Sequence, residues 1–306
     1  MNTVSSLSST ELAARLAAGL HLRTGNFTTR LQTAIPSVAR GIGLLYADYA
    51  IEGPASFADF HLELARPRNP RRWIRPQVQL LYDGRALFKP LPLDQAFPMF
   101  EWGLNWCISS RAHRYLIVHA AVVEKHGRAA ILPAPPGSGK STLCAALVGR
   151  GGWRLLSDEL TLLRLDDGQL APVPRPISLK NQSIELIRGY LGDAVLSDPV
   201  SDTTKGTVAH MKAPRESIEQ SHCGATPAWV VFPQYAAGAE PVATPMAPAH
   251  TFMQLADNTF NYSLLGVQGF DALARLIDAS AGYQFRYSRL DDGLAFFDRL
   301  AAGQQP

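Results

Sequence analysis

Hydrophobic residues follow two different spacing patterns along the chain. Near the start, Leu12, Leu16 and Leu20 follow one another at four-residue intervals, which places them on one face of a helix. Ser8 and Glu11 precede them with the spacing of a capping box, so a helix is expected to begin there. From about residue 27 the hydrophobic pattern changes to short apolar runs, which are typical of strands. The expected strands of this part of the chain are 43–46, 60–64 and 78–82.

Turn-forming residue pairs separate these runs and indicate a small, sheet-rich N-terminal region. The clearest pair is Asp83-Gly84, which lies between two apolar runs and predicts a hairpin. Residues 96–114 then follow a helical pattern, and the simplest role for their aromatic side chains is packing. We therefore expect an α+β region over residues 1–110 and a second domain over residues 111–306.

The second domain mixes predicted strands and helices, which corresponds to an α/β fold. It opens with a hairpin whose strands, 116–124 and 128–132, are joined at Lys125-His126-Gly127. Residues 191–227 are rich in Asp, Ser, Thr, Lys and Pro and are expected to form mobile loops. The other expected strands are 154–156, 160–165, 169–173, 228–233 and 283–287, and the helices are 141–148, 183–190, 247–257, 267–280 and 290–300.

Composition narrows the class of protein. The chain is 46% hydrophobic and 18% charged, and its net charge of +3 gives no electrostatic case for nucleic acid or an anionic membrane as partner. Cys107, Cys144 and Cys223 lack any CxxC spacing, which argues against a disulfide framework and a zinc site. No signal peptide and no run approaching 18 apolar residues is visible. We expect a cytoplasmic protein.

Residues 134–141 contain a phosphate-loop pattern. They read Ala-Pro-Pro-Gly-Ser-Gly-Lys-Ser and match Gly-x-x-x-x-Gly-Lys-[Ser/Thr] except at Ala134. In such a loop small residues let backbone N–H groups approach phosphates, the lysine neutralises them and the next hydroxyl binds Mg²⁺. An expected strand precedes the loop and an expected helix follows it, although a plain turn before a helix is the alternative. The predicted ATP contacts are Pro136, Gly137, Ser138, Gly139, Lys140, Ser141 and Thr142.

Two adjacent acids follow the expected strand 154–156. Mg²⁺ takes carboxylate ligands as well as a hydroxyl, so we expect it to bind among Ser141, Asp158 and Glu159. Two acids can divide the work, since one can bind the metal while the other accepts a proton from an attacking hydroxyl. An exposed acidic turn is the alternative interpretation.

The stretch from His119 to Leu163 resembles the core of the HPr kinase/phosphorylase family, in particular the shorter HPr-kinase-related proteins of bacteria. The resemblance rests on three elements in order. They are His119-Ala120-Ala121-Val122-Val123, the loop Pro136-Gly137-Ser138-Gly139-Lys140-Ser141-Thr142, and Leu155-Leu156-Ser157-Asp158-Glu159. It implies a kinase core with a fold like that of phosphoenolpyruvate carboxykinase, and phosphoryl transfer from ATP to a hydroxyl, usually of a serine.

The resemblance also implies roles for single residues. Lys140 and Ser141 would hold phosphate and Mg²⁺. Asp158 matches the family's general base, and Glu159 matches the second acid, which is usually Asp. His119 matches a histidine close to the transferred phosphate, whereas without the resemblance it reads as a core histidine in an apolar strand.

The downstream family signature that engages HPr is not recognisable here. Basic stretches at 175–181 and 204–207 stand in its place, and Lys180 and Lys205 are expected to contact phosphate or else to lie in surface loops. The predicted partner is a protein or peptide that carries a hydroxyl. A small-molecule kinase of the same fold and a non-catalytic nucleotide-binding switch are the alternatives. Oligomers are common in the family, which leaves a homo-oligomer open.

Overall fold

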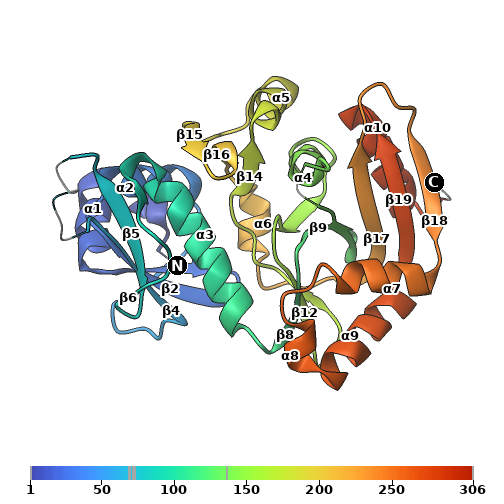
Figure 1. Ribbon diagram of the computed structural model, residues 1–306, viewed down its shortest axis with the longest axis horizontal. Helices are drawn as coiled ribbons and strands as arrows, with labels where there is room; N and C mark the ends of the chain where they lie inside the picture. The colour runs from blue at the N-terminus through green and yellow to red at the C-terminus, as the bar shows by residue number, and fades with distance from the viewer. Residues whose placement is uncertain (1, 68–69, 71–73, 136, 305–306) are drawn as a thin grey trace.

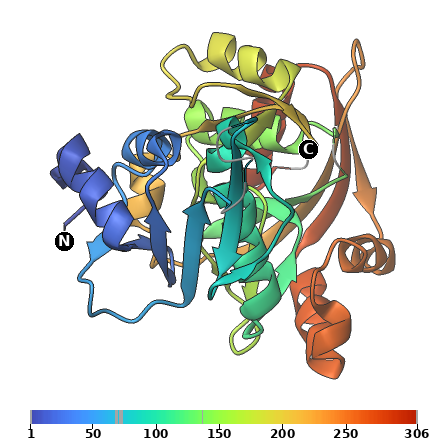
Figure 2. The same cartoon turned by 60° about the vertical axis from the view of Figure 1, so that its left-hand side comes forward.

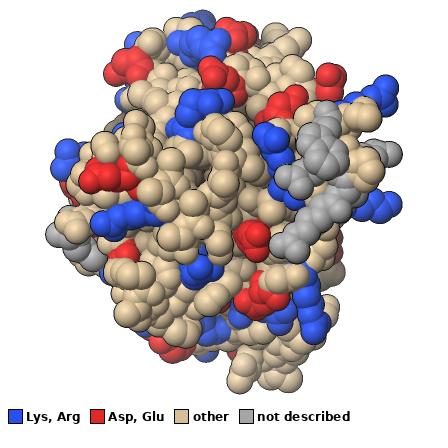
Figure 3. Space-filling view, turned by 90° about the vertical axis from the view of Figure 1, so that its left-hand side faces the viewer, with Lys and Arg blue, Asp and Glu red and all other residues tan. Residues whose placement is uncertain are grey.

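The computed structural model describes residues 2–67, 70, 74–135 and 137–304 of the chain. It has a mixed α/β architecture in which the strands of the described residues form four sheets. In Figures 1 and 2, helix α3 (Ala96–Arg111) lies between the N-terminal sheet and the rest of the chain. On the face shown in Figure 3, acidic and basic side chains are interspersed. None of the described helices combines the length and the apolar character that crossing a bilayer requires.

The N-terminal sheet has the strand order β3-β1-β2-β4-β5-β6, with β7 paired to β5. Helix α1 (Ser9–Ala18) confirms the predicted capping box, because Ser8 and Glu11 bond to each other's backbone N–H. The helix ends before Gly19, which has a φ of +107°, so Leu20 begins a strand instead. The strands are β1 (Leu20–Thr24), β2 (Phe27–Thr33), β3 (Ile51–Glu52), β4 (Phe60–Ala65), β5 (Gln77–Tyr82), β6 (Arg85–Ala86) and β7 (Leu91–Pro92).

One expected strand of this region is wrong. Residues 43–46 end helix α2 (Pro36–Leu45). Val38, Ile42 and Leu45 recur at helical spacing and are all buried, and the proline sets φ for the first turn. The predicted hairpin at Asp83-Gly84 is confirmed, since both residues have positive φ between β5 and β6.

A six-stranded sheet of order β11-β9-β10-β17-β19-β18 forms the centre of the second half. Strands β10, β17 and β19 are parallel, and the other pairings are antiparallel. Buried side chains alternate between its faces: Val123 and Val231 belong to one core cluster, and Val122 and Val230 to another. The strands are β9 (Ala120–Lys125), β10 (Arg128–Pro133), β11 (Arg154–Ser157), β17 (Thr226–Tyr235), β18 (Val242–Met246) and β19 (Ala281–Tyr287).

Helices cover both faces of this sheet. The first core cluster includes buried residues of α4 (Lys140–Gly149), α5 (Gln182–Leu191) and α10 (Leu290–Ala301), and the second includes residues of α7 (Pro248–Ala256) and α9 (Val267–Asp278). The first cluster also runs through α2 and α3, so the core is continuous across the expected boundary at residue 110. That boundary remains a prediction.

The run expected as one strand over 116–124 divides at His119. Strand β8 (Tyr115–Val118) pairs with β12 (Thr161–Arg164), which also pairs with β13 (Leu170–Ala171), while β9 joins the central sheet. His119 therefore lies at a junction, where its N–H donates to the Asn258 carbonyl at 2.7 Å.

The expectation of loops over 191–227 is also wrong. This segment contains β15 (Val200–Thr203), β16 (Gly206–Met211) and α6 (Arg215–Glu219), and β16 pairs with β14 (Ile177–Lys180). Val208, Ala209 and Met211 are buried in β16, although the segment is polar in overall composition. The short helix α8 (Tyr262–Leu265) was not predicted either.

Candidate functional site

The Gly-rich loop between β10 and α4 is tightly held by the central sheet. The Tyr235 N–H donates to the Ser138 carbonyl at 3.0 Å, and the Tyr287 hydroxyl donates to the Gly139 carbonyl at 3.4 Å. Gly137 and Gly139 have φ values of +88° and +89°, which favour glycine. Helix α4 begins at Lys140 with no side-chain cap, so the first N–H groups and the positive end of its dipole are available to an anion.

Lys140 and His119 meet beside this loop. The Lys140 Nζ lies 3.3 Å from the His119 Nε2, and both side chains are largely withdrawn from solvent. Burial, reinforced by Lys140, lowers the pKa of His119 to about 4, so the ring is neutral near pH 7. A neutral ring with its proton on Nδ1 accepts a hydrogen bond from the ammonium group at Nε2. Burial lowers the pKa of Lys140 as well, against the pull of Asp158 and Glu159.

The two acids have opposite electrostatic environments. Asp158 is buried, and its Oδ2 accepts from the Ser178 N–H at 3.0 Å. Burial and the neighbouring Glu159 raise the pKa of Asp158. Burial acts on Glu159 in the same direction, but the cations Lys205, Lys180, Lys140 and Arg175 together hold its pKa below the ordinary value. Such a split pair suits one base that gains a proton and one acid that stays charged.

A pocket of about 670 Å³ opens over the Gly-rich loop. Asp158 instead faces a smaller cavity, which meets the large pocket at Glu159 and Ser178. Lys205 does not line the large pocket, and its ammonium lies 5.5 Å from the centre of the Trp102 ring. Pro136 lies outside the residues that the structure describes. The predicted residues that line the large pocket are His119, Gly137, Ser138, Gly139, Lys140, Ser141, Thr142, Glu159 and Lys180.

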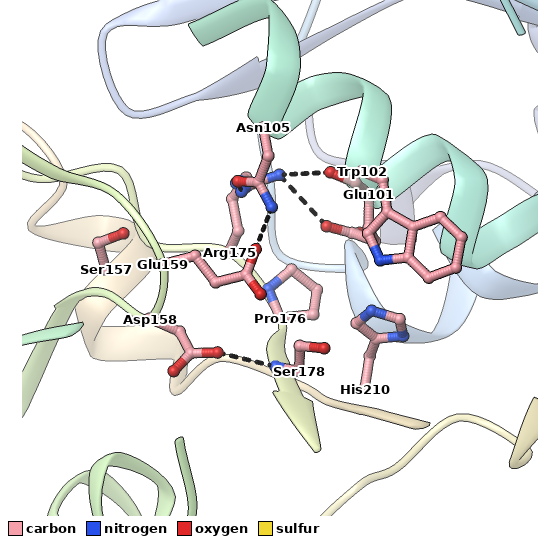
Figure 4. Close-up of a pocket in the computed structure, with 10 residues that line it drawn as sticks. All are labelled: Glu101, Trp102, Asn105, Ser157, Asp158, Glu159, Arg175, Pro176, Ser178 and His210. Carbon is pink, nitrogen blue, oxygen red and sulfur yellow. Dashed lines mark hydrogen bonds and ion pairs between the residues drawn. The ribbon is translucent and has the colours of Figure 1, made fainter. Parts of the chain in front are cut away.

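Several residues around the two cavities were not predicted from the sequence. One wall of the large pocket comes from α5 and another from the start of α10, through Leu186, Tyr190 and Leu290. The smaller cavity is shown in Figure 4 and draws on α3, on β16 and on the segment before β14. Its unpredicted lining residues are Glu101, Trp102, Asn105, Pro176 and His210, together with Arg175 from the basic stretch already noted.

The donor set near the loop fits Mg²⁺ only together with a nucleotide. Within the described residues no group of three or more His, Cys, Asp or Glu side chains could hold a metal ion by itself. Mg²⁺ is usually bound through one or two carboxylates plus substrate phosphates and waters. The Asp158 Oδ1 is buried and has no hydrogen-bond partner among the described residues, and it is an oxygen of the type that Mg²⁺ prefers. Ser141 and one carboxylate of the pair therefore fit a shared metal–phosphate site, which leaves the other acid for proton transfer.

Comparison with known proteins gives little further guidance. No protein family and no curated protein matches the sequence. Among solved structures, the Hpr(Ser) kinase/phosphatase of Coxiella burnetii is similar over 61% of this chain and 98% of its own, at 12% identity and a TM-score of 0.28. This is a weak, fold-level relation, from which no substrate or reaction follows.

Proposed function

We propose that the chain is an ATP- and Mg²⁺-dependent kinase that transfers the γ-phosphate to a hydroxyl of a protein or peptide, most simply a serine. One observation carries the proposal. Lys140, at the start of α4, contacts His119, and Glu159 joins both in one pocket although the three residues come from separate segments. A plain Gly/Pro turn before a helix would not require a histidine and a carboxylate beside the lysine.

The pocket has the groups that a triphosphate needs. The N–H groups at the start of α4 and the Lys140 ammonium would bind the outer phosphates, and Lys180 lines the same pocket. Because His119 is neutral, it would add no positive charge that repels the Lys140 ammonium. Leu186 and Tyr190 offer an apolar wall on which the nucleoside could lie.

The acid pair divides the chemistry. Asp158, with its raised pKa, would accept the proton of the acceptor hydroxyl as the new oxygen–phosphorus bond forms and the bond to the ADP leaving group breaks. Glu159, which the surrounding cations keep charged, would hold the metal together with Ser141. Bound Mg²⁺ would neutralise charge on the phosphates. The protein side of the reaction is thus positioning, charge balance and one proton transfer.

Labelled ATP tests this proposal. The protein is incubated with Mg²⁺ and γ-labelled ATP in parallel with a serine-containing peptide pool and with a metabolite pool. Label in peptide supports the proposal, whereas label only in small molecules favours the small-molecule kinase. ATP binding without label in either pool would leave a nucleotide-binding switch as the better description.

A further inference from the structure

Helix α3 of the N-terminal region reaches the acid pair through Asn105. The Asn105 Nδ2 donates a hydrogen bond to the Glu159 Oε2, and its Oδ1 accepts one from the Arg175 Nη2 (Figure 4). A carboxylate only accepts and a guanidinium only donates, so the two partners fix which way the amide points. Asn105 therefore bridges Glu159 and Arg175 through its amide group.

Asn105 is itself anchored by a buried polar chain. The Arg175 Nη1 lies 3.3 Å from the Glu101 Oε2, and both side chains are buried. The Glu101 Oε1 accepts from the Tyr46 hydroxyl at 2.6 Å, which connects this polar network to the C-terminal end of α2. Buried networks of this kind resist rearrangement, because each lost bond leaves a further buried polar group without a partner.

The same helix also lies beside a second residue whose charge acts on Glu159. Lys205, the cation that most lowers the pKa of Glu159, lies over the ring of Trp102, one turn before Asn105 on α3. A helix that only braced the fold would need the apolar contacts of Phe97, Phe100 and Leu104, which are all buried. It would not need an amide donor on the carboxylate of the candidate site.

We infer that α3 is an integral part of the site and that Asn105 is a positioning residue for Glu159. This inference rests on the proposed function, in which Glu159 holds the metal of a bound metal–nucleotide. With Asn105 in place, the Glu159 Oε2 is held by a hydrogen bond, which fixes the carboxylate where the two cavities meet. Without it, Glu159 can rotate onto Arg175 or Lys205. Removal of a partner that orients a metal ligand typically weakens metal binding by about 10–100-fold.

The test measures metal affinity without turnover. Mn²⁺, which replaces Mg²⁺ and is detected by electron paramagnetic resonance, is titrated into the full chain with a non-hydrolysable ATP analogue present. Asn105→Ala should weaken Mn²⁺ binding about 10–100-fold. The affinity of this variant for a fluorescent ATP analogue, measured without metal, should match that of the wild type, which also shows that the variant is folded. Asn105→Leu, which keeps the side-chain volume, should behave alike.

Asn26→Ala is the matched control. The Asn26 Nδ2 donates to the Tyr115 hydroxyl at 3.4 Å and so also links the N-terminal region to the second half, but neither residue lines the two cavities. This variant should bind Mn²⁺ as the wild type does. Equal Mn²⁺ affinity in the wild type and both Asn105 variants overturns the inference alone. A wild-type protein that takes up no Mn²⁺-nucleotide overturns the proposed function and the inference with it.

Discussion

Alanine at Gly139 tests how the loop is held against the central sheet. Gly137 and Gly139 share nearly the same positive φ, so alanine at either costs about 1–2 kcal/mol of backbone strain. At Gly139 the added Cβ would lie 2.7 Å from the Tyr287 Oη and 3.2 Å from the Tyr235 Cβ, whereas at Gly137 it would meet no atom within 4 Å. Overpacking typically adds about 1–3 kcal/mol. We expect the free energy of unfolding to fall by about 1–2 kcal/mol in Gly137→Ala and by about 2–5 kcal/mol in Gly139→Ala.

The closest contact can be removed separately. Tyr287→Phe deletes the Oη, and since its bond to the Gly139 carbonyl is long, at 3.4 Å, this change alone should cost about 1 kcal/mol or less. Combined with Gly139→Ala, it should recover part of the loss. The free energies of unfolding come from urea titrations that are followed by tryptophan fluorescence. Equal losses for the two alanine variants, or strictly additive losses in the double variant, would refute this account of the loop.

Two further predictions concern the framework of the site. Burial raises the pKa of Glu101 from 4.5 to about 7, even beside Arg175. The folded chain thus holds this proton more tightly than the unfolded one. The resulting stability is present below pH 4.5 and is lost as the pH rises through about 7, a fall of about 3 kcal/mol. Urea titrations across this pH range should show the fall in the wild type and not in Glu101→Gln. The same dependence of the unfolding free energy on pH in both proteins would contradict this prediction. Asn261→Ala removes the partners of the Ile117 N–H, at 2.9 Å, and of the Tyr115 carbonyl, at 2.8 Å. It should cost about 2–4 kcal/mol in the same assay, and a loss under about 0.5 kcal/mol would show that these bonds do not hold the strand.

The parts of the site that lie close together in sequence could be predicted, because their chemistry is local. The Gly-rich loop is a contiguous run in which two glycines, a lysine and a hydroxyl follow in order. The acids Asp158 and Glu159 are adjacent at the end of a short strand. Figure 4 shows the contrast: Asn105 reaches Glu159 across 54 positions of sequence from a helix whose pattern indicates only packing. A single polar residue on an amphipathic helix looks the same whether it faces water or a buried carboxylate.

The errors in the fold have equally physical causes. A four-residue apolar run, such as 43–46, is compatible with a helix end as well as with a strand. The hairpin β15–β16 was hidden because its apolar residues are few and its turn is polar, although Val208 and Met211 are buried. The division of 116–124 at His119 depends on the Asn258 carbonyl, which lies far away in the sequence. Tertiary contacts decide each of these cases, and none leaves a periodic pattern.

Separating nucleotide binding from phosphoryl transfer is the most direct test of the central claim. Affinity for Mg²⁺ with a non-hydrolysable ATP analogue and the rate of label transfer to an accepted substrate are measured in the wild type, Lys140→Ala and Asp158→Asn. We predict that Lys140→Ala loses binding and transfer together. Asp158→Asn should keep nucleotide affinity within a few-fold and lose about 10²–10⁴-fold in transfer rate. Transfer at the wild-type rate in Asp158→Asn, or undiminished binding in Lys140→Ala, would contradict the proposed site.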